Sequence, residues 1–174
     1  NVDEAGRGSA VGDGVAGGVR HQGRDFREFP LAFRAIERWL TLEDELAANV
    51  DYRRGGHATV TEHLDDLPVL AASVRAQQIA GLSIEVVQGD DLRTLIPGIS
   101  PNALAAAWSP NDGHANPTAT TKAFATAARR TGATVREGVT VTGLVHEHDR
   151  VSGVATDQGP IAADIVVLAA GAWS

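Results

Sequence analysis

The stretch DIVVLAAGAWS, residues 164–174, contains an unbroken apolar run from Ile165 to Ala170. A run this rich in β-branched and aliphatic residues is typical of a strand that is buried on both faces, as in a parallel sheet covered by helices. Gly171 then predicts a tight turn, because glycine tolerates backbone conformations that other residues avoid. The stretch therefore predicts a fully buried strand, and a chain that continues beyond the turn.

The region before this strand alternates between helix and strand signals. Amphipathic helices are predicted over residues 29–46, 61–80 and 117–131, and the third has Asn116 as its N-cap and Gly132 as its stop. A short helical turn is predicted in 90–99, before Pro97 ends it. Strands are predicted over 57–60, 83–87, 103–109, 133–137, 140–148, 150–157 and 160–171. This order predicts an α/β fold with a small antiparallel insertion.

Length and composition narrow the function classes. The chain has 174 residues, a net charge of −7 and 43% apolar residues, so it can form one ordinary globular domain and has no basic field for nucleic acid. It has no Cys, which excludes disulfides, thiolate zinc sites and a flavin linked through cysteine. No apolar stretch has membrane-spanning length and no signal-peptide layout is present, so we expect a cytoplasmic protein. The chain also lacks Met, so we expect it to be an internal segment.

The segment GSAVGDGVAGGVRHQGR, residues 8–24, carries the strongest local signal for a binding site. Closely spaced glycines allow backbone N–H groups to point at an anion, and Arg20, His21 and Arg24 add cationic donors. A flexible surface loop is the alternative, since the spacing matches neither a P-loop nor a clean GxGxxG turn after a strand. The segment alone leaves both interpretations open.

Histidines and tryptophans give weaker signals. His146 and His148 share a strand face, but a solvated hairpin tip is favoured over a metal site, and no metal is predicted. His114 precedes a helix start, where a turn-stabilising role is favoured over a ligand contact. Trp39 and Trp108 fit core positions, whereas Trp173 fits a core position or a stack on a planar cofactor equally well.

Four pieces in order resemble the FAD-dependent oxidoreductases of the D-amino-acid oxidase family, which includes sarcosine oxidase, its β subunit and glycine oxidase. They are DEAGRGSAVGDGVAGGVR (3–20), YRRGGHATV (52–60), DGHANPTATTKAFATAARRTGATVREGVTVTGL (112–144) and DIVVLAAGAWS (164–174). The resemblance implies a partial FAD/NAD(P)-binding Rossmann-like fold with an inserted α+β portion of a substrate domain. It also implies three segments: an FAD-binding portion (1–48), a substrate-domain portion (49–115) and a second FAD-binding portion (116–174).

The same resemblance implies roles for individual residues. Asp3 matches the acid that hydrogen-bonds the adenosine ribose, and Gly12 stands in the glycine loop where the family usually has Ser or Thr at the pyrophosphate. The remaining matches are Gly17, Gly18 and Val19 beside the flavin ring, Val141 or its neighbour Val139 at the adenine, and Ala170 and Gly171 at the turn back to the dinucleotide. Arg20 matches a basic position near the flavin, and it is the candidate partner for either a substrate carboxylate or the flavin itself. Arg53 and Arg54 are weaker candidates, for which structural salt bridges are favoured.

The implied cofactor is FAD, held without a covalent bond. The position of the flavin-linked His of sarcosine oxidase β subunits falls on Pro117 here. The first strand with its GxGxxG turn would precede Asn1, so the chain alone is expected to be inactive.

The resemblance implies an enzyme that oxidises the C–N bond of a small amino acid or secondary amine of the sarcosine, glycine or proline type. Hydride would pass to the flavin, and O2 or another acceptor would take the electrons. One alternative is a non-catalytic relative or subunit segment that needs a partner subunit. A second alternative keeps the fold and oxidises a hydroxy substrate such as glycerol 3-phosphate.

Overall fold

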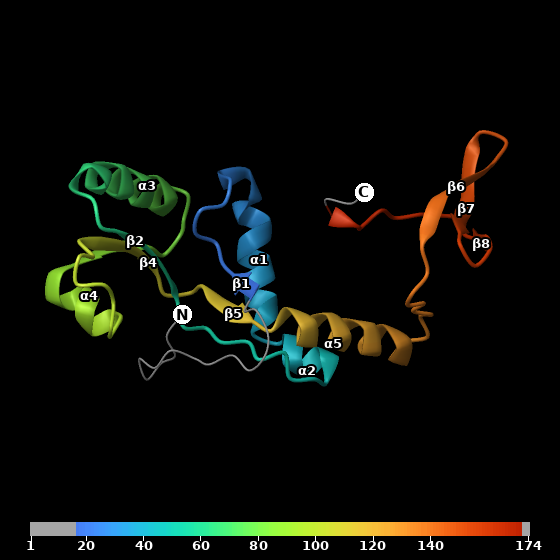
Figure 1. Ribbon diagram of the computed structural model, residues 1–174, viewed down its shortest axis with the longest axis horizontal. Coiled ribbons are helices and arrows are strands. Elements are labelled where there is room, and N and C mark those ends of the chain that lie inside the picture. Colours follow the sequence, from blue (N-terminus) through green and yellow to red (C-terminus); the bar gives the residue numbers. More distant parts are fainter. Residues whose placement is uncertain (1–16, 172–174) are drawn as a thin grey trace. The chain divides into compact units, whose positions relative to one another are not determined.

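The computed structural model describes residues 17–171, which form two compact units (Figure 1). The first unit ends at Thr131 and the second begins at Gly132. Each unit is described by itself below. This division rests on contacts within the chain, and the boundaries predicted at 48/49 and 115/116, which concern cofactor and substrate binding, stay predictions.

The first unit contains a three-stranded antiparallel sheet. Its order is β2-β4-β3, with β2 at His57–Thr61, β4 at Ala105–Ser109 and β3 at Glu85–Gln88. Helix α3 (Leu67–Ile79) lies on one side of this sheet and α4 (Gly89–Leu95) on the other (Figure 1). Successive residues of a strand point to opposite faces, so Ala107 joins the core under α3 while Ala106 joins the core under α4.

A second group of elements contains the two-stranded antiparallel pair of β1 (Gly17–Val19) and β5 (Gly113–Ala115). The other elements of this group are the 3₁₀ turn η1 (Phe26–Glu28), α1 (Phe29–Trp39), α2 (Leu42–Leu46) and α5 (Pro117–Arg130). Val19 of β1, Ala115 of β5 and Ile36 of α1 form one apolar cluster. Buried residues of α2 and α5 form a neighbouring cluster around Val50.

The helix predicted over 29–46 is two helices, and that prediction was wrong in its continuity. The backbone tightens after Trp39, where the Leu40 and Thr41 N–H groups bond to carbonyls three residues back. The reason lies in the core: Ile36 packs in the cluster with β1, whereas Leu42 packs with α5. The chain must turn between them to bury both.

The helix predicted from Thr61 begins later than expected, because Thr61 is the last residue of β2. The short 3₁₀ turn η2 (Leu64–Asp66) comes first, and the Thr61 hydroxyl donates to the Asp66 carboxylate across it at 3.2 Å. Only the later part of the predicted apolar stripe is buried: Leu64 is 72% exposed, while Val74 is 3% exposed.

The third predicted helix is confirmed as α5. The Asn116 side chain accepts a hydrogen bond from the Ala119 N–H at 3.0 Å, and Pro117 occupies the first helical position. The predicted strands over 57–60, 83–87 and 103–109 are confirmed as β2, β3 and β4, with shifts of up to two residues at their ends.

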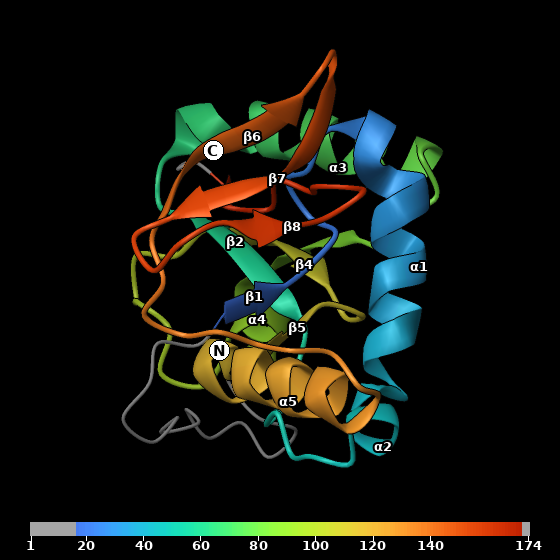
Figure 2. The same cartoon turned by 90° about the vertical axis from the view of Figure 1, so that its right-hand side faces the viewer.

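The second unit is a three-stranded antiparallel meander (Figure 2). Its strands are β6 (Val141–Glu147), β7 (Arg150–Thr156) and β8 (Ile161–Ala162). The register between β6 and β7 shifts at Gly143 and again between Val145 and His146. Such bulges bend a hairpin and increase its twist.

One predicted strand of this unit is absent and another is mostly absent. Residues 133–137 form no strand, and the strand predicted over 160–171 is present only at Ile161–Ala162, since residues 164–170 pair with no strand among the described residues. The prediction that the apolar run is a buried strand was therefore wrong for this chain: Ile165 is 81% exposed and Val167 is 79% exposed. Apolar composition alone cannot make a strand, because the backbone N–H and C=O groups need a hydrogen-bonding neighbour.

Within residues 17–171, every helix is too short or too polar to cross a membrane.

Candidate functional site

The residues predicted to contact a flavin ring form β1 and the loop that follows it. Gly17, Gly18 and Val19 pair with Ala115, His114 and Gly113 of β5. Val19 points into the core, whereas Gly18 is exposed and Arg20 follows it on the surface. The arrangement presents backbone without side chains directly beside a guanidinium group.

Arg20 meets His57, the first residue of β2, which the sequence did not single out. The Arg20 Nη1 atom lies 3.3 Å from His57 Nε2, a hydrogen bond in which the guanidinium donates and the imidazole accepts. Burial lowers the pKa of His57, the positive charge of Arg20 lowers it further, and Asp112 opposes the shift. His57 is therefore neutral at pH 7, and it orients Arg20 without neutralising its charge.

A buried carboxylate holds the loop that carries Arg20. Asp112 is completely buried, and its Oδ1 accepts hydrogen bonds from the His21 backbone N–H at 2.8 Å and from the His21 ring Nδ1 at 2.7 Å. Its Oδ2 accepts from the Gln22 backbone N–H at 3.1 Å. A carboxylate with three donors is well satisfied in the interior, where an unpaired one would be costly.

The main chain of Asp112 anchors the segment that carries His57. Its carbonyl oxygen accepts a hydrogen bond from the Gly56 N–H at 2.7 Å. The packing here is close: a Cβ atom added at Gly56 would overlap the Trp108 ring, and one added at Gly113 would overlap the Arg53 carbonyl. Asp112 thus fixes both neighbours of the Arg20–His57 contact.

The sequence analysis did not single out Asp112, which lies in the segment Pro-Asn-Asp-Gly after β4. Nothing local marks this residue, because Asp is common in turns whether or not its carboxylate is buried. Its partners lie 90 and 91 positions earlier in the chain.

The other arginine candidates have structural contacts. Arg53 forms the favoured salt bridge, with its Nε 3.1 Å from Asp51 Oδ1, and its backbone pairs with His114. Arg54 instead donates to the Asn111 side chain. It also lines a small cavity of about 220 Å³, together with His21 and Glu37.

His114 lies inside β5, not in the turn where it was expected. It is 2% exposed, and burial lowers its pKa while the charge of Asp51 acts in the opposite direction. Its backbone pairs with Gly18 on one side and bonds with Arg53 on the other, so it connects β1 to the segment that contains Arg53.

Trp39 occupies a core position as expected, against Tyr52 with ring centroids 5.4 Å apart.

Three of the predicted cofactor residues lie in the second unit. Val141 begins β6, pairs with Thr156 and is 56% exposed. Ala170 and Gly171 are exposed, and Gly171 has a positive φ of 62°. This conformation strains residues with a side chain, so it agrees with the predicted turn at Gly171. Asp3, Gly12 and Trp173 lie outside the described residues.

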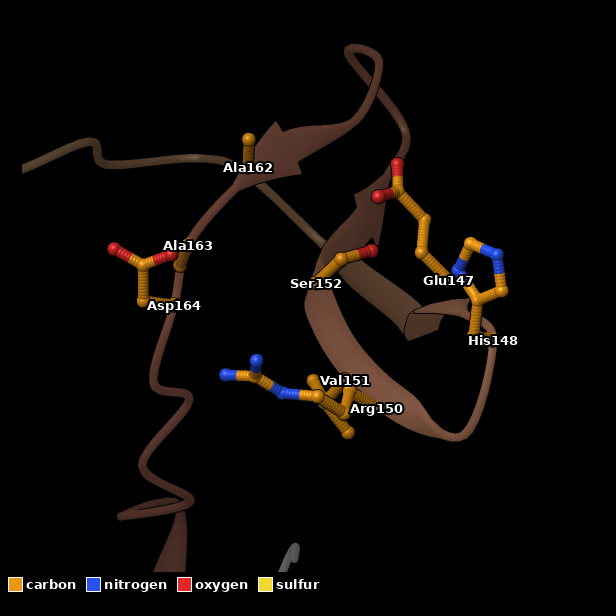
Figure 3. Close-up of a pocket in the computed structure, with 8 residues that line it drawn as sticks. All are labelled: Glu147, His148, Arg150, Val151, Ser152, Ala162, Ala163 and Asp164. Carbon is orange, nitrogen blue, oxygen red and sulfur yellow. The ribbon is translucent and has the colours of Figure 1, made fainter.

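The second unit contains a cavity with a volume of about 640 Å³. Figure 3 shows the Arg150 and Asp164 side chains on one side of it and Glu147 and His148, at the hairpin tip, on the other. None of the predicted site residues lines it. Across residues 17–171, no group of His, Asp or Glu side chains is arranged to hold a metal ion.

Comparison with known proteins supplies the context for these residues. The family model described as FAD dependent oxidoreductase matches residues 3–174. The chain is 34% identical over 148 residues to the 4-methylaminobutanoate oxidase (formaldehyde-forming) of Paenarthrobacter nicotinovorans, a match that covers 83% of this chain and 18% of that oxidase.

Two solved structures resemble this chain over almost its whole length. The L-proline dehydrogenase from P. horikoshii has a TM-score of 0.81 at 26% identity, covering 91% of this chain and 42% of that one. The glycine oxidase from Bacillus cereus has a TM-score of 0.76 at 27% identity, covering 92% of this chain and 45% of that one. These matches confirm the predicted fold class, and the chain spans less than half the length of each of these three relatives.

Proposed function

Because the chain belongs to the family of FAD-dependent oxidoreductases, whose model matches residues 3–174, we propose that the protein containing it oxidises the C–N bond of a small amino acid or secondary amine. The three relatives described above support this class, since their names specify 4-methylaminobutanoate, L-proline and glycine as substrates. Sarcosine, glycine and proline are the proposed substrate types. The cytoplasmic location stays a prediction.

The residues around β1 fit the ring end of FAD. Gly18 places bare backbone on the surface beside the half-buried Gly17, which lets a planar group approach closely, and Arg20 adds a positive charge beside it. Asp3, Gly12, Val141, Ala170 and Gly171 are the proposed contacts to the rest of the cofactor. The chemistry that bound FAD would supply is an acceptor for the hydride equivalent from the α carbon of the amine. We propose that it is held without a covalent bond.

The observation that supports this proposal most directly is that the Arg20 guanidinium keeps its positive charge unpaired among the described residues. No carboxylate within residues 17–171 forms an ion pair with it, and its hydrogen-bond partner His57 is a neutral acceptor. A guanidinium that keeps its full charge can pair bidentately with a carboxylate. We therefore assign Arg20 to the carboxylate of the amino-acid substrate, which it would hold so that the α C–H faces the flavin. Holding a substrate in one orientation accounts for a large part of many rate enhancements.

The test uses the complete product of the gene that encodes this sequence. The purified protein is expected to carry flavin absorbance that bleaches without oxygen on addition of sarcosine, glycine or proline. Acid precipitation should release all flavin into the supernatant, as expected for non-covalent binding. Absence of flavin after incubation with FAD would refute the proposal. Bleaching by glycerol 3-phosphate alone would assign a hydroxy substrate instead. Peroxide formation in air would identify O2 as the electron acceptor.

The variant Arg20→Gln tests the assigned role. The KM for the amino acid should rise about tenfold or more, because a charge-assisted pair is lost, while the flavin content is unchanged. Arg27→Gln is the matched control, since Arg27 is an exposed arginine whose partner is Asp25. If Arg20→Gln instead changed the flavin reduction potential and left KM unaltered, Arg20 would act on the flavin.

A further inference from the structure

We propose that Asp112 is a positioning residue that holds Arg20 against His57, so that the guanidinium stays aimed at the substrate site. That Asp112 holds Arg20 against His57 is argued from the described contacts alone. That the guanidinium is aimed at a substrate rests on the function proposed above. Asp112 lies too deep to touch a ligand, since it is completely buried. Its effect must therefore pass through the residues that it contacts.

The first contact set fixes the chain immediately after Arg20. Both carboxylate oxygens of Asp112 accept backbone N–H bonds, from His21 at 2.8 Å and from Gln22 at 3.1 Å. The His21 ring bonds to the same carboxylate and lies 4.9 Å from the Phe33 ring, centroid to centroid. With two successive residues held in this way, the Arg20 backbone has little freedom to rotate.

The second contact fixes the chain immediately before His57. The Asp112 carbonyl accepts the Gly56 N–H at 2.7 Å, and Gly56 packs on Trp108 with no space for a side chain. One residue therefore determines the placement of both partners of the 3.3 Å Arg20–His57 hydrogen bond. Surface arginines have several flexible torsions, and ordering them on binding costs conformational entropy. Because the chain on both sides of the contact is already anchored, less of that entropy has to be lost when the substrate binds.

Other contacts of the loop do not perform the same task. The Gln22 side chain donates to the Ala107 carbonyl at 2.9 Å and accepts from the Thr59 hydroxyl at 3.2 Å. These bonds tie the loop to β4 and to the middle of β2. The Arg24 N–H bonds to the His21 carbonyl at 3.3 Å and the Arg24 Nε bonds to the Arg20 carbonyl at 2.8 Å, but both bonds stay within the loop. Among the hydrogen bonds of the described residues, Asp112 is the partner of the His21 N–H and ties it to the segment that follows β4.

The test measures the contact between Arg20 and His57 and does not require enzyme activity. In the complete protein, the pKa of His57 is followed by NMR, first with Arg20 present and then in Arg20→Gln. Loss of the neighbouring charge should raise the pKa of His57, since that charge lowers it. The same pair is then compared in the Asp112→Asn background. If Asp112 positions Arg20, the increase caused by Arg20→Gln should shrink to less than half.

Asn keeps the shape of Asp112 but turns one acceptor into a donor, so at least one backbone bond of the loop is lost. The double-mutant cycle cancels the direct effect of the Asp112 charge on His57, because that effect is the same for the two members of each pair. An equal pKa increase in both backgrounds would overturn the proposal. Ser109→Ala is the control: it alters another fully buried polar side chain nearby, and the increase should stay unchanged.

The kinetic arm separates this inference from the proposed function. Asp112→Asn should raise the KM for the amino acid about tenfold. It should have little further effect on KM when Arg20→Gln is already present. Equal effects in both backgrounds would reduce Asp112 to a structural role. A protein without flavin or turnover would refute the proposed function, and the His57 titration would still decide whether Asp112 positions Arg20.

Should Asp112→Asn fail to fold, both cycles are run with His21→Gln. This variant loses the ring-to-carboxylate bond and keeps both backbone bonds, so a smaller coupling of the same sign is expected. No coupling in a folded His21→Gln protein would overturn the proposal.

Discussion

At the scale of single residues, Gly56 shows how tightly the start of β2 is packed. It has a φ of +78°, and an added Cβ would overlap the Trp108 ring. Gly56→Ala should therefore lower the free energy of unfolding by about 3 kcal/mol or more, since strain and overpacking each cost about 1–3 kcal/mol. Urea denaturation followed by tryptophan fluorescence measures this change.

Gly23→Ala provides the matched control for that variant. Gly23 has a φ of +76°, and nothing lies within 4 Å of an added Cβ. It therefore carries the backbone strain alone, and a loss of about 1 kcal/mol is expected. Equal losses in the two variants would show that Trp108 moves aside without cost, which would contradict the packing argument.

The site residues differ in how far the sequence could predict them. Arg20 is conspicuous because it follows a glycine-rich loop, a signal contained in a few adjacent letters. Asp112 and His57 are ordinary residues in a turn and in a strand, and their importance depends on contacts with residues at least 37 positions away. Sequence patterns report local conformation well, and they carry little information about which distant side chains meet.

At the scale of elements, α5 is the one whose boundaries depend on its own sequence. Asn116→Ala removes the acceptor of the Ala119 N–H and should destabilise the protein by about 1 kcal/mol in thermal or urea unfolding. Asn116→Asp keeps an acceptor oxygen and should retain most of the stability. A full loss in the Asp variant as well would mean that the cap bond is not the cause.

The same locality explains which elements were predicted correctly. Cap, proline and terminal glycine all lie within or next to α5, so its ends could be recognised from the sequence. The break between α1 and α2 could not, because it arises from two different core clusters. The run at 164–170 has the composition of a strand but no pairing strand among the described residues. Whether such a segment forms a strand depends on neighbouring strands, which its composition cannot specify.

At the scale of the whole molecule, the connection between the two units is an exposed segment without regular secondary structure. It extends from Gly132 to Thr140 and contains Arg136. Brief trypsin treatment should cut after Arg136 and release a fragment that keeps α1 to α5, because helices with buried faces resist cleavage. Mass spectrometry identifies the fragment, and circular dichroism shows whether its helices persist.

Arg136→Gln removes this site and should abolish that fragment while leaving other cuts unchanged. Rapid cleavage within α3 or α5 in the unsubstituted protein would contradict the division into two compact units.

The separation between Asp112 and the loop that it holds also bears on biosynthesis. His21 and Asp112 are 91 positions apart. At about 5–20 residues per second, a ribosome needs roughly 5–18 seconds to add the later residue after the earlier one. During that interval the nascent loop lacks the carboxylate that holds it, so the arginine reaches its final placement only after synthesis has passed β4.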